Sequence, residues 1–147
     1  MDSHALIVKP ETRTPAINVL GVMVTVLASG DATGSGEITL QEGQEGMGPP
    51  PHSHNWDESF FILEGSVEIQ VDGRNELCGP GTLVHVPAGS AHGFRFGADG
   101  GKMLEFTGRD ARATDMFKAL ADEIRPDAPD LAKVKKVFDR NGVALHI

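Results

Sequence analysis

The chain of 147 residues fits one globular domain, and with 39% hydrophobic residues it can build a packed core, which excludes a disordered protein. Its 21 acidic residues outnumber its 13 lysines and arginines, and the formal net charge of −8 disfavours nucleic acid and anionic membranes as partners. The single cysteine cannot form an internal disulfide. The longest apolar run, residues 19–28, is about half as long as a membrane span. We therefore expect a soluble cytoplasmic protein.

Up to about residue 110, short apolar runs alternate with turn-forming sequences that are rich in glycine and proline. In the clearest strand, Val67, Ile69 and Val71 share one face, because successive side chains of a strand point to opposite sides. Asp72-Gly73 then predicts a tight hairpin turn. Short strands joined by frequent turns predict an antiparallel sandwich or barrel for this part of the chain.

After residue 110 the apolar residues recur at helical spacing, which predicts two short helices. The first helix carries Met116, Phe117, Leu120 and Ile124, and the second carries Leu131, Val134, Val137 and Phe138. Pro126 ends the first helix. Asp127 or Asp130 caps the second helix, which ends at Asn141-Gly142. We expect both helices to pack on the outside of the sheet; covering a pocket or joining two subunits is the alternative.

Three histidines and one glutamate have the residue types and the spacing of a metal site. His52 and His54 are separated by one residue, so their side chains point to the same side of an extended strand, and Glu58 keeps the same parity. His92 follows in a separate strand. The four side chains could converge on one divalent ion with coordination positions left open. For His52 and His54 alone, the alternative is a pair of surface histidines.

The residues around these four side chains follow two regular patterns. The first is Gly46, five residues, His52-Ser53-His54, three residues, Glu58, six residues and Gly65. The second is Gly81, five residues, Pro87, one residue, Gly89, two residues and His92, and fifteen residues separate the two patterns. Residues 46–65 and 81–92 resemble the two signature motifs of the cupin superfamily.

This resemblance implies an all-β fold, a double-stranded β-helix that forms a jelly-roll-like barrel over about residues 17–107, with a short C-terminal helical tail. We therefore expect a barrel with an N-terminal strand in residues 1–110 and a two-helix tail packed on the barrel in residues 111–147. Gly65 and Gly89 are expected at turns whose backbone conformation disfavours a Cβ.

The resemblance also implies a metal centre inside one end of the barrel, with one divalent ion per chain held by His52, His54, Glu58 and His92. Iron is the expected metal, and nickel, manganese, zinc and cobalt are the alternatives, because nitrogen and oxygen ligands suit them all. A barrel that keeps this shape while its site is empty or weak is the alternative to a metal-binding protein.

One position departs from the cupin pattern: the second motif usually ends with asparagine four residues after its histidine, and Phe96 stands there. Side chains at every second position from each ligand turn inward. This predicts an apolar pocket around the ion, lined by Phe60, Ile62, Phe94, Phe96 and Trp56. Such a pocket suits a flat aromatic or enolic molecule. Filling the barrel core is the alternative role of the phenylalanines, and Trp56 lies either at the pocket mouth or on the surface.

Residues 48–54 and 56–65 look most like quercetin-dioxygenase-type cupins. That resemblance implies a metal-dependent dioxygenase acting on an aromatic or enolic small molecule. Glu58 is then the catalytic candidate, either as a fixed ligand or as the group that accepts the substrate proton. A non-redox cyclase or isomerase, similar to polyketide cyclases, is the first alternative. A metal- or ligand-binding module without catalysis is the second.

The resemblance bears on assembly as well, since cupins of this size often pair through their N-terminal strands. Residues 22–27 are apolar on both faces. Such a strand must be covered on both sides or paired with a neighbour. We therefore expect a homodimer that binds a small-molecule substrate.

Overall fold

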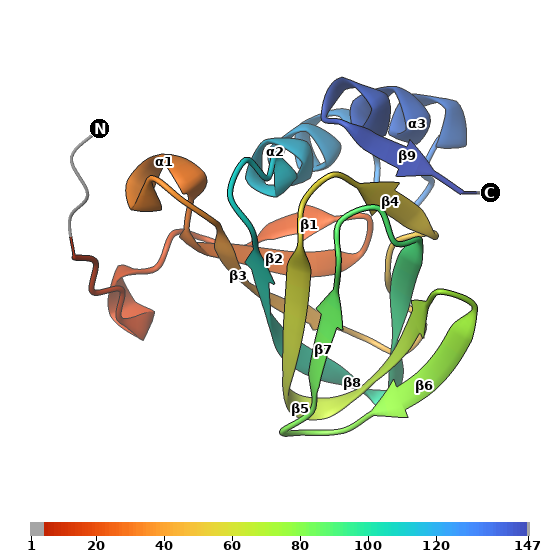
Figure 1. The fold of residues 1–147 in the computed structure, drawn as a ribbon, viewed down its shortest axis with the longest axis horizontal. Helices are drawn as coiled ribbons and strands as arrows, with labels where there is room; N and C mark the ends of the chain where they lie inside the picture. The colour runs from red at the N-terminus through yellow and green to blue at the C-terminus, as the bar shows by residue number, and fades with distance from the viewer. Residues whose placement is uncertain (1–4, 147) are drawn as a thin grey trace.

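The computed structural model describes residues 5–146, whose strands form one antiparallel sheet curled into a barrel with helices over one end (Figure 1). The strands are β1 (Ile17–Val19), β2 (Val22–Ala28), β3 (Ile38–Gly43), β4 (His52–His54), β5 (Glu58–Val71), β6 (Arg74–Cys78), β7 (Leu83–Val86), β8 (His92–Thr107) and β9 (Val143–Leu145). The helices are the short η1 (Pro10–Thr12), α1 (Gly30–Thr33), α2 (Ala113–Glu123) and α3 (Leu131–Arg140). In this described part of the chain, none of the helices has the length and apolar composition needed to cross a membrane. The predicted all-β barrel with a C-terminal helical tail is confirmed.

The two longest strands, β5 and β8, pair with each other along most of their length and connect the two halves of the sheet. β5 also pairs with β6 and β7, and β8 also pairs with β3. Their register shifts on either side of Gly65, which has a φ of +67°, and a Cβ there would lie 2.1 Å from the backbone oxygen of Gly100. Gly89 has a φ of +88°. The expectation that both positions have a backbone conformation that disfavours a Cβ is confirmed, and Gly89 lies in a turn. The expected turn at Gly65 is wrong, because Gly65 lies within β5 at the register shift.

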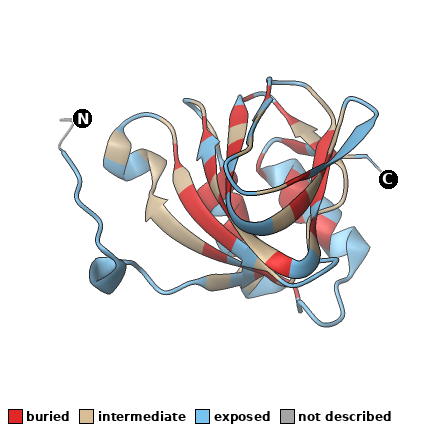
Figure 2. Ribbon diagram, turned by 90° about the horizontal axis from the view of Figure 1, so that it is seen from below, coloured by how far each residue is buried: buried red, intermediate tan, exposed pale blue. Residues whose placement is uncertain are grey.

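The hydrophobic core fills the barrel and continues between the barrel and the helices. Within the barrel it consists of inward-facing side chains of β5, β7 and β8: Phe60, Ile62, Val67, Ile69, Val86, Phe94, Phe96 and Met103. At the predicted hairpin between β5 and β6, Asp72 and Gly73 both have positive φ, as a two-residue turn of this kind requires. Figure 2 shows the buried segments gathered in the barrel and helices, whereas the N-terminal segment is exposed.

The C-terminal tail is attached to the barrel at both of its ends. Oε1 of the buried Glu37 accepts hydrogen bonds from the backbone N–H groups of Ala113 and Thr114, at 3.0 and 3.3 Å, and so caps α2. Asp130, one of the two predicted caps, accepts hydrogen bonds from the backbone N–H groups of Ala132 and Lys133 in the first turn of α3. β9, which the sequence analysis does not predict, pairs with β4. The tail therefore returns to the sheet after crossing the barrel end.

Candidate metal centre

Three strands bring the four predicted ligands together at the end of the barrel near the tail (Figure 1). His52 and His54 lie on β4, Glu58 begins β5 and His92 begins β8. β4 pairs with β8 at one position, His52 with His92, which brings the two imidazole ring centroids to 4.4 Å. All four residues are buried, and one ligand atom from each lies within 4.8 Å of the others.

Backbone hydrogen bonds orient all three imidazoles. The Nδ1 atoms lie close to backbone carbonyl oxygens: His52 to Pro50 at 2.8 Å, His54 to Trp56 at 3.0 Å and His92 to Ser90 at 2.9 Å. Because a carbonyl oxygen only accepts, each Nδ1 carries a proton, which leaves each Nε2 to face the other candidate ligands. Metal-binding histidines are oriented in this way, with Nδ1 or Nε2 donating to a second group while the other nitrogen faces the ion.

The Nε2 atoms of His54 and His92 point to the carboxylate of Glu58. Oε2 of Glu58 lies 2.9 Å from Nε2 of His54 and 2.8 Å from Nε2 of His92. Two acceptors at this distance need a shared cation, which is either a proton on the imidazole or a metal ion. Three imidazole nitrogens and one carboxylate oxygen suit divalent iron, nickel, manganese, cobalt and zinc. These residues therefore fit a metal centre, and they do not select one of these metals.

Burial and charge act in opposite directions on these groups. Burial alone would raise the pKa of the Glu58 carboxyl, but hydrogen bonds from Glu105 and from two imidazoles outweigh burial and hold that pKa well below its ordinary value. Burial, together with nearby His92, lowers the pKa of His52 to about 4. Glu58 is therefore ionised and His52 uncharged at neutral pH, which are the protonation states that bind a metal.

A second buried carboxyl, Glu105 on β8, is adjacent to Glu58. The two carboxyl groups share a hydrogen bond, and Glu105 also accepts one from Oγ1 of Thr39, 3.3 Å away. Burial, followed by the charge of Glu58 and the hydrogen bond between the two groups, raises the pKa of Glu105 well above its ordinary value. Glu105 is therefore the protonated member of this pair, and Glu58 is the charged one.

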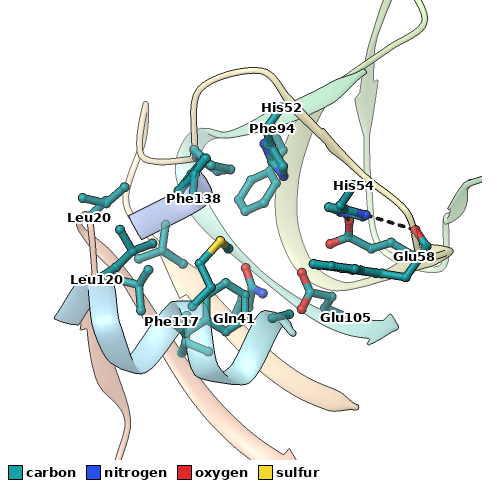
Figure 3. Close-up of a pocket in the computed structure, with 17 residues that line it drawn as sticks. Leu20, Gln41, His52, His54, Glu58, Phe94, Glu105, Phe117, Leu120 and Phe138 are labelled. Carbon is teal, nitrogen blue, oxygen red and sulfur yellow. Dashed lines mark hydrogen bonds and ion pairs between the residues drawn. The ribbon is translucent and has the colours of Figure 1, made fainter. Parts of the chain in front are cut away.

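A cavity of about 40 Å³ lies between the candidate ligands and the tail. In Figure 3 its polar side is formed by His54, Glu58 and Glu105, and its apolar side by Leu20, Phe117, Leu120 and Phe138. Such a volume holds about three water molecules. Pockets for typical small-molecule ligands have about 300–1,000 Å³. A ligand of more than a few atoms therefore requires α2 and α3 to shift outward.

Two of the five predicted pocket residues, Trp56 and Phe94, line this cavity. Trp56 is buried and stacks on the imidazole of His54, with ring centroids 4.2 Å apart and planes 7° from parallel. Its Nε1 has no hydrogen-bond partner within residues 5–146. The other three, Phe60, Ile62 and Phe96, point into the barrel but pack in the core and do not line the cavity. The cavity lies at the end of the barrel and not inside it. Its apolar wall is therefore formed by side chains of α2 and α3, and not by Phe60, Ile62 and Phe96 as the alternation along the strands predicts.

The polar residues Gln41 and Glu105 complete the cavity, and no sequence motif points to either of them. Glu105 lies between the apolar residues Leu104 and Phe106. If these two apolar side chains faced the core, the alternation along the strand would turn Glu105 toward solvent. Instead Glu105 is buried, whereas Phe106 is 37% exposed. The pairing of β5 and β8 shifts register after Phe96. Even-numbered residues of β8 face inward before the shift, and odd-numbered residues face inward after it. A count by twos that starts at His92 therefore cannot be carried through to Glu105.

Residues 35–106 match the sequence profile of the family described as Cupin domain. This segment is a cupin domain. It begins just before β3, ends one residue before the end of β8, and contains both spaced motifs and all four candidate ligands. The family resemblance inferred from those motifs is confirmed.

One sequence relative and several solved structures are similar to this chain. Quercetin 2,3-dioxygenase from Bacillus subtilis (strain 168) is 32% identical over 87 residues, which are 58% of this chain and 26% of that protein, so the chain spans about a quarter of the relative's length. The structure of KdgF from Halomonas sp. has a TM-score of 0.68 at 14% identity and covers 76% of this chain and 99% of its own. The polyketide cyclase RemF from Streptomyces resistomycificus has a TM-score of 0.61 at 24% identity, with coverages of 71% and 80%. These two structures share the cupin fold with this chain.

Proposed function

We propose that this cupin is a metal-dependent dioxygenase that acts on a small aromatic or enolic molecule, with iron as the first metal to test. The observation that carries the proposal is the convergence of three imidazole nitrogens and one ionised carboxylate at the wall of a largely apolar cavity. A metal ion held there would supply Lewis-acid activation of a substrate oxygen and redox chemistry with O2. The local sequence similarity to quercetin 2,3-dioxygenase supports this choice of reaction.

Glu58 is the proposed proton acceptor. Its carboxylate is buried and ionised, while Glu105 beside it holds a proton. Apolar side chains of α2 and α3 close the cavity, so a substrate hydroxyl that enters meets this carboxylate with little competition from water. Trp56 and Phe94 offer apolar ring faces for a flat substrate to pack against.

Oxygen uptake tests the proposal. Chelator-treated protein is reloaded with iron, nickel, manganese or cobalt and mixed with 1,3-diketones or with flavonols, and oxygen is followed with an electrode. We expect uptake with at least one metal and an oxygenated product by mass spectrometry. Because the cavity is only about 40 Å³, small 1,3-diketones should react faster than flavonols.

The double variant His52→Ala, His92→Ala should lose bound metal and all metal-dependent oxygen uptake, because half of the ligand set is removed. The matched control is His85→Ala. His85 is an exposed histidine that is hydrogen-bonded to Ser59 on the outside of the barrel, and its replacement should leave metal content and rate unchanged. Uptake that persists in the double variant, or that is absent with every metal, contradicts the proposal.

A non-redox reaction is the second candidate, favoured by the pairing of Glu58 with Glu105. One carboxylate that accepts a proton and one carboxyl that holds a proton can move a proton between two substrate atoms, as an isomerase or cyclase does. Zinc has no redox chemistry, so product formed by the zinc-loaded protein under argon would favour this reaction over oxygenation. Saturable binding without product in either experiment would indicate a binding module.

A further inference from the structure

Gln41 is a buried amide in the wall of the cavity, and its two polar ends have different surroundings. It lies on β3 and is 2% exposed. Its Nε2 donates a hydrogen bond to Oγ1 of Thr39, 3.2 Å away, and Gln41 lies beside Glu105. Thr39 in turn donates to Oε1 of Glu105 at 3.3 Å. These contacts fix the orientation of the amide, because only its nitrogen can donate to them.

The side-chain oxygen of Gln41 accepts no hydrogen bond from the part of the chain that the structure describes. Figure 3 shows this oxygen turned away from Glu105, toward the middle of the cavity. The oxygen is open to the cavity, so it can accept a hydrogen bond from a donor that comes from outside the chain. A molecule bound in the cavity is in position to supply that donor.

We propose that Gln41 is a second polar anchor for the substrate, and that its side-chain oxygen accepts a hydrogen bond from a substrate hydroxyl while another substrate oxygen lies at the candidate metal centre. This proposal rests on the proposed function, since it assumes that the substrate reaches the four candidate ligands. It adds a substrate class to that function, because the second anchor requires a second oxygen function on the substrate.

The spacing of the two anchors limits the size of the substrate. Gln41 and Glu105 are both hydrogen-bonded to Oγ1 of Thr39, at 3.2 and 3.3 Å, and Glu105 is adjacent to Glu58, so the two anchors are a few hydrogen-bond lengths of about 3 Å apart. This separation is on the scale of one substituted ring, which enters the 40 Å³ cavity once α2 and α3 shift outward. The inferred substrate is therefore a small ring or enol whose two oxygen functions are on non-adjacent atoms.

Binding of three phenols to the zinc-loaded protein under argon tests this anchor without requiring turnover. Trp56 is the one tryptophan, the chain has no tyrosine, and Trp56 lines the cavity, so quenching of its fluorescence reports occupancy. Phenol has one hydroxyl, whereas resorcinol and hydroquinone have a second that cannot reach the same ion. We expect at least one of these two to bind about tenfold more tightly than phenol, as one added hydrogen bond in a buried site allows.

The variant Gln41→Leu should abolish this preference, so that all three phenols bind with about the affinity of phenol. Gln41→Met, which keeps the length of the side chain but has no oxygen acceptor, repeats the test in case the leucine variant folds poorly. Gln70→Leu is the matched control, because Gln70 lies on β5 outside the cavity wall, and it should keep the preference. Zinc content is measured for every variant, and the metal-free proteins are titrated in parallel.

Wild-type protein that does not prefer either dihydroxy phenol, or Gln41 variants that keep the preference, would overturn the proposal. That failure is distinct from failure of the proposed function, because oxygen uptake and its loss in the histidine double variant do not depend on Gln41. If oxygen uptake is absent but the preference exists and is lost with Gln41, the second anchor is supported and the cavity serves binding.

Discussion

The imidazoles of His52 and His92 are both buried, and their surroundings shift their pKa values in opposite directions. Burial lowers the pKa at both positions, but at His92 the hydrogen bond and the negative charge of Glu58 outweigh burial and raise the pKa above its ordinary value. At His52 burial dominates, and its pKa falls from 6.5 to about 4. In the metal-free protein, His52 is therefore the histidine whose protonation favours the unfolded chain.

This difference predicts a pH-dependent stability that can be assigned to His52. Between about pH 6.5 and pH 4, the unfolded chain binds a proton at this residue that the folded chain does not, so stability falls as the pH falls. The loss amounts to about 2 kcal/mol by pH 5. Urea unfolding of chelator-treated protein near pH 7.5 and near pH 5 should show this loss in the wild type, and His52→Gln should lack it.

The comparison with the variant is essential because His92 contributes with the opposite sign, and its contribution is present in both proteins. Phe138 lies edge-on to His52, with ring centroids 5.9 Å apart, and helps to enclose it. If wild type and His52→Gln lose the same stability between the two pH values, the burial of His52 does not control the acid sensitivity.

Among the elements, β4 depends most on its neighbours, because it has three residues and two of them are candidate ligands. It pairs with β8 at one position, whereas it pairs with β9 at three: His52 with Leu145, Ser53 with Ala144 and His54 with Val143. The C-terminal strand therefore holds the ligand strand in place, and the tail contributes to the metal centre without supplying a ligand.

Ala144→Pro should weaken metal binding by about tenfold or more, because proline cannot donate to the strand ladder and outer contacts of metal ligands have effects of this size. Ala144 is exposed, so the substitution removes little core packing. Competition with a chromogenic chelator measures the affinity. Ala5→Pro, in the exposed N-terminal segment, is the control. Equal affinities for the two variants would show that β9 does not support the ligand strand.

At the scale of the whole molecule, the N-terminal segment is the least integrated part of the described chain. It extends away from the barrel in Figure 1, and its side chains Leu6, Ile7 and Val8 are 47%, 84% and 40% exposed. On β2, which pairs with β1 and β3, Met23 remains 39% exposed. Exposed apolar side chains near an edge of the sheet are typical of an interface with a second copy.

The expected homodimer therefore remains a prediction with a defined test. Light scattering after size-exclusion chromatography, over a concentration series, should give the mass of two chains. Ile7→Glu or Met23→Glu should raise the dissociation constant by about tenfold or more, because a charge would be buried in the interface. Leu77→Glu, at an exposed leucine on β6, should have no effect. A wild-type monomer at all concentrations would rule out this assembly.

The sequence by itself determined the barrel, the helical tail and the turns other than the one expected at Gly65. Alternation with a period of two, glycines with positive φ and helix caps act over a few residues, so they can be recognised locally. The spacing of His52, His54 and Glu58 is local in the same way, and His92 was reached because the spacing between its motif and the first one follows the cupin pattern. The structure brings these four side chains together.

Only the tertiary structure decided what surrounds those four side chains. Gln41 and Glu105 become cavity residues through strand register, and Glu105 meets Glu58 across the β5–β8 pairing. The tail covers the barrel end because Glu37 caps α2 and β9 pairs with β4. Contacts between residues so far apart in the chain depend on the packing of whole elements, and short-range sequence patterns carry no information about that packing.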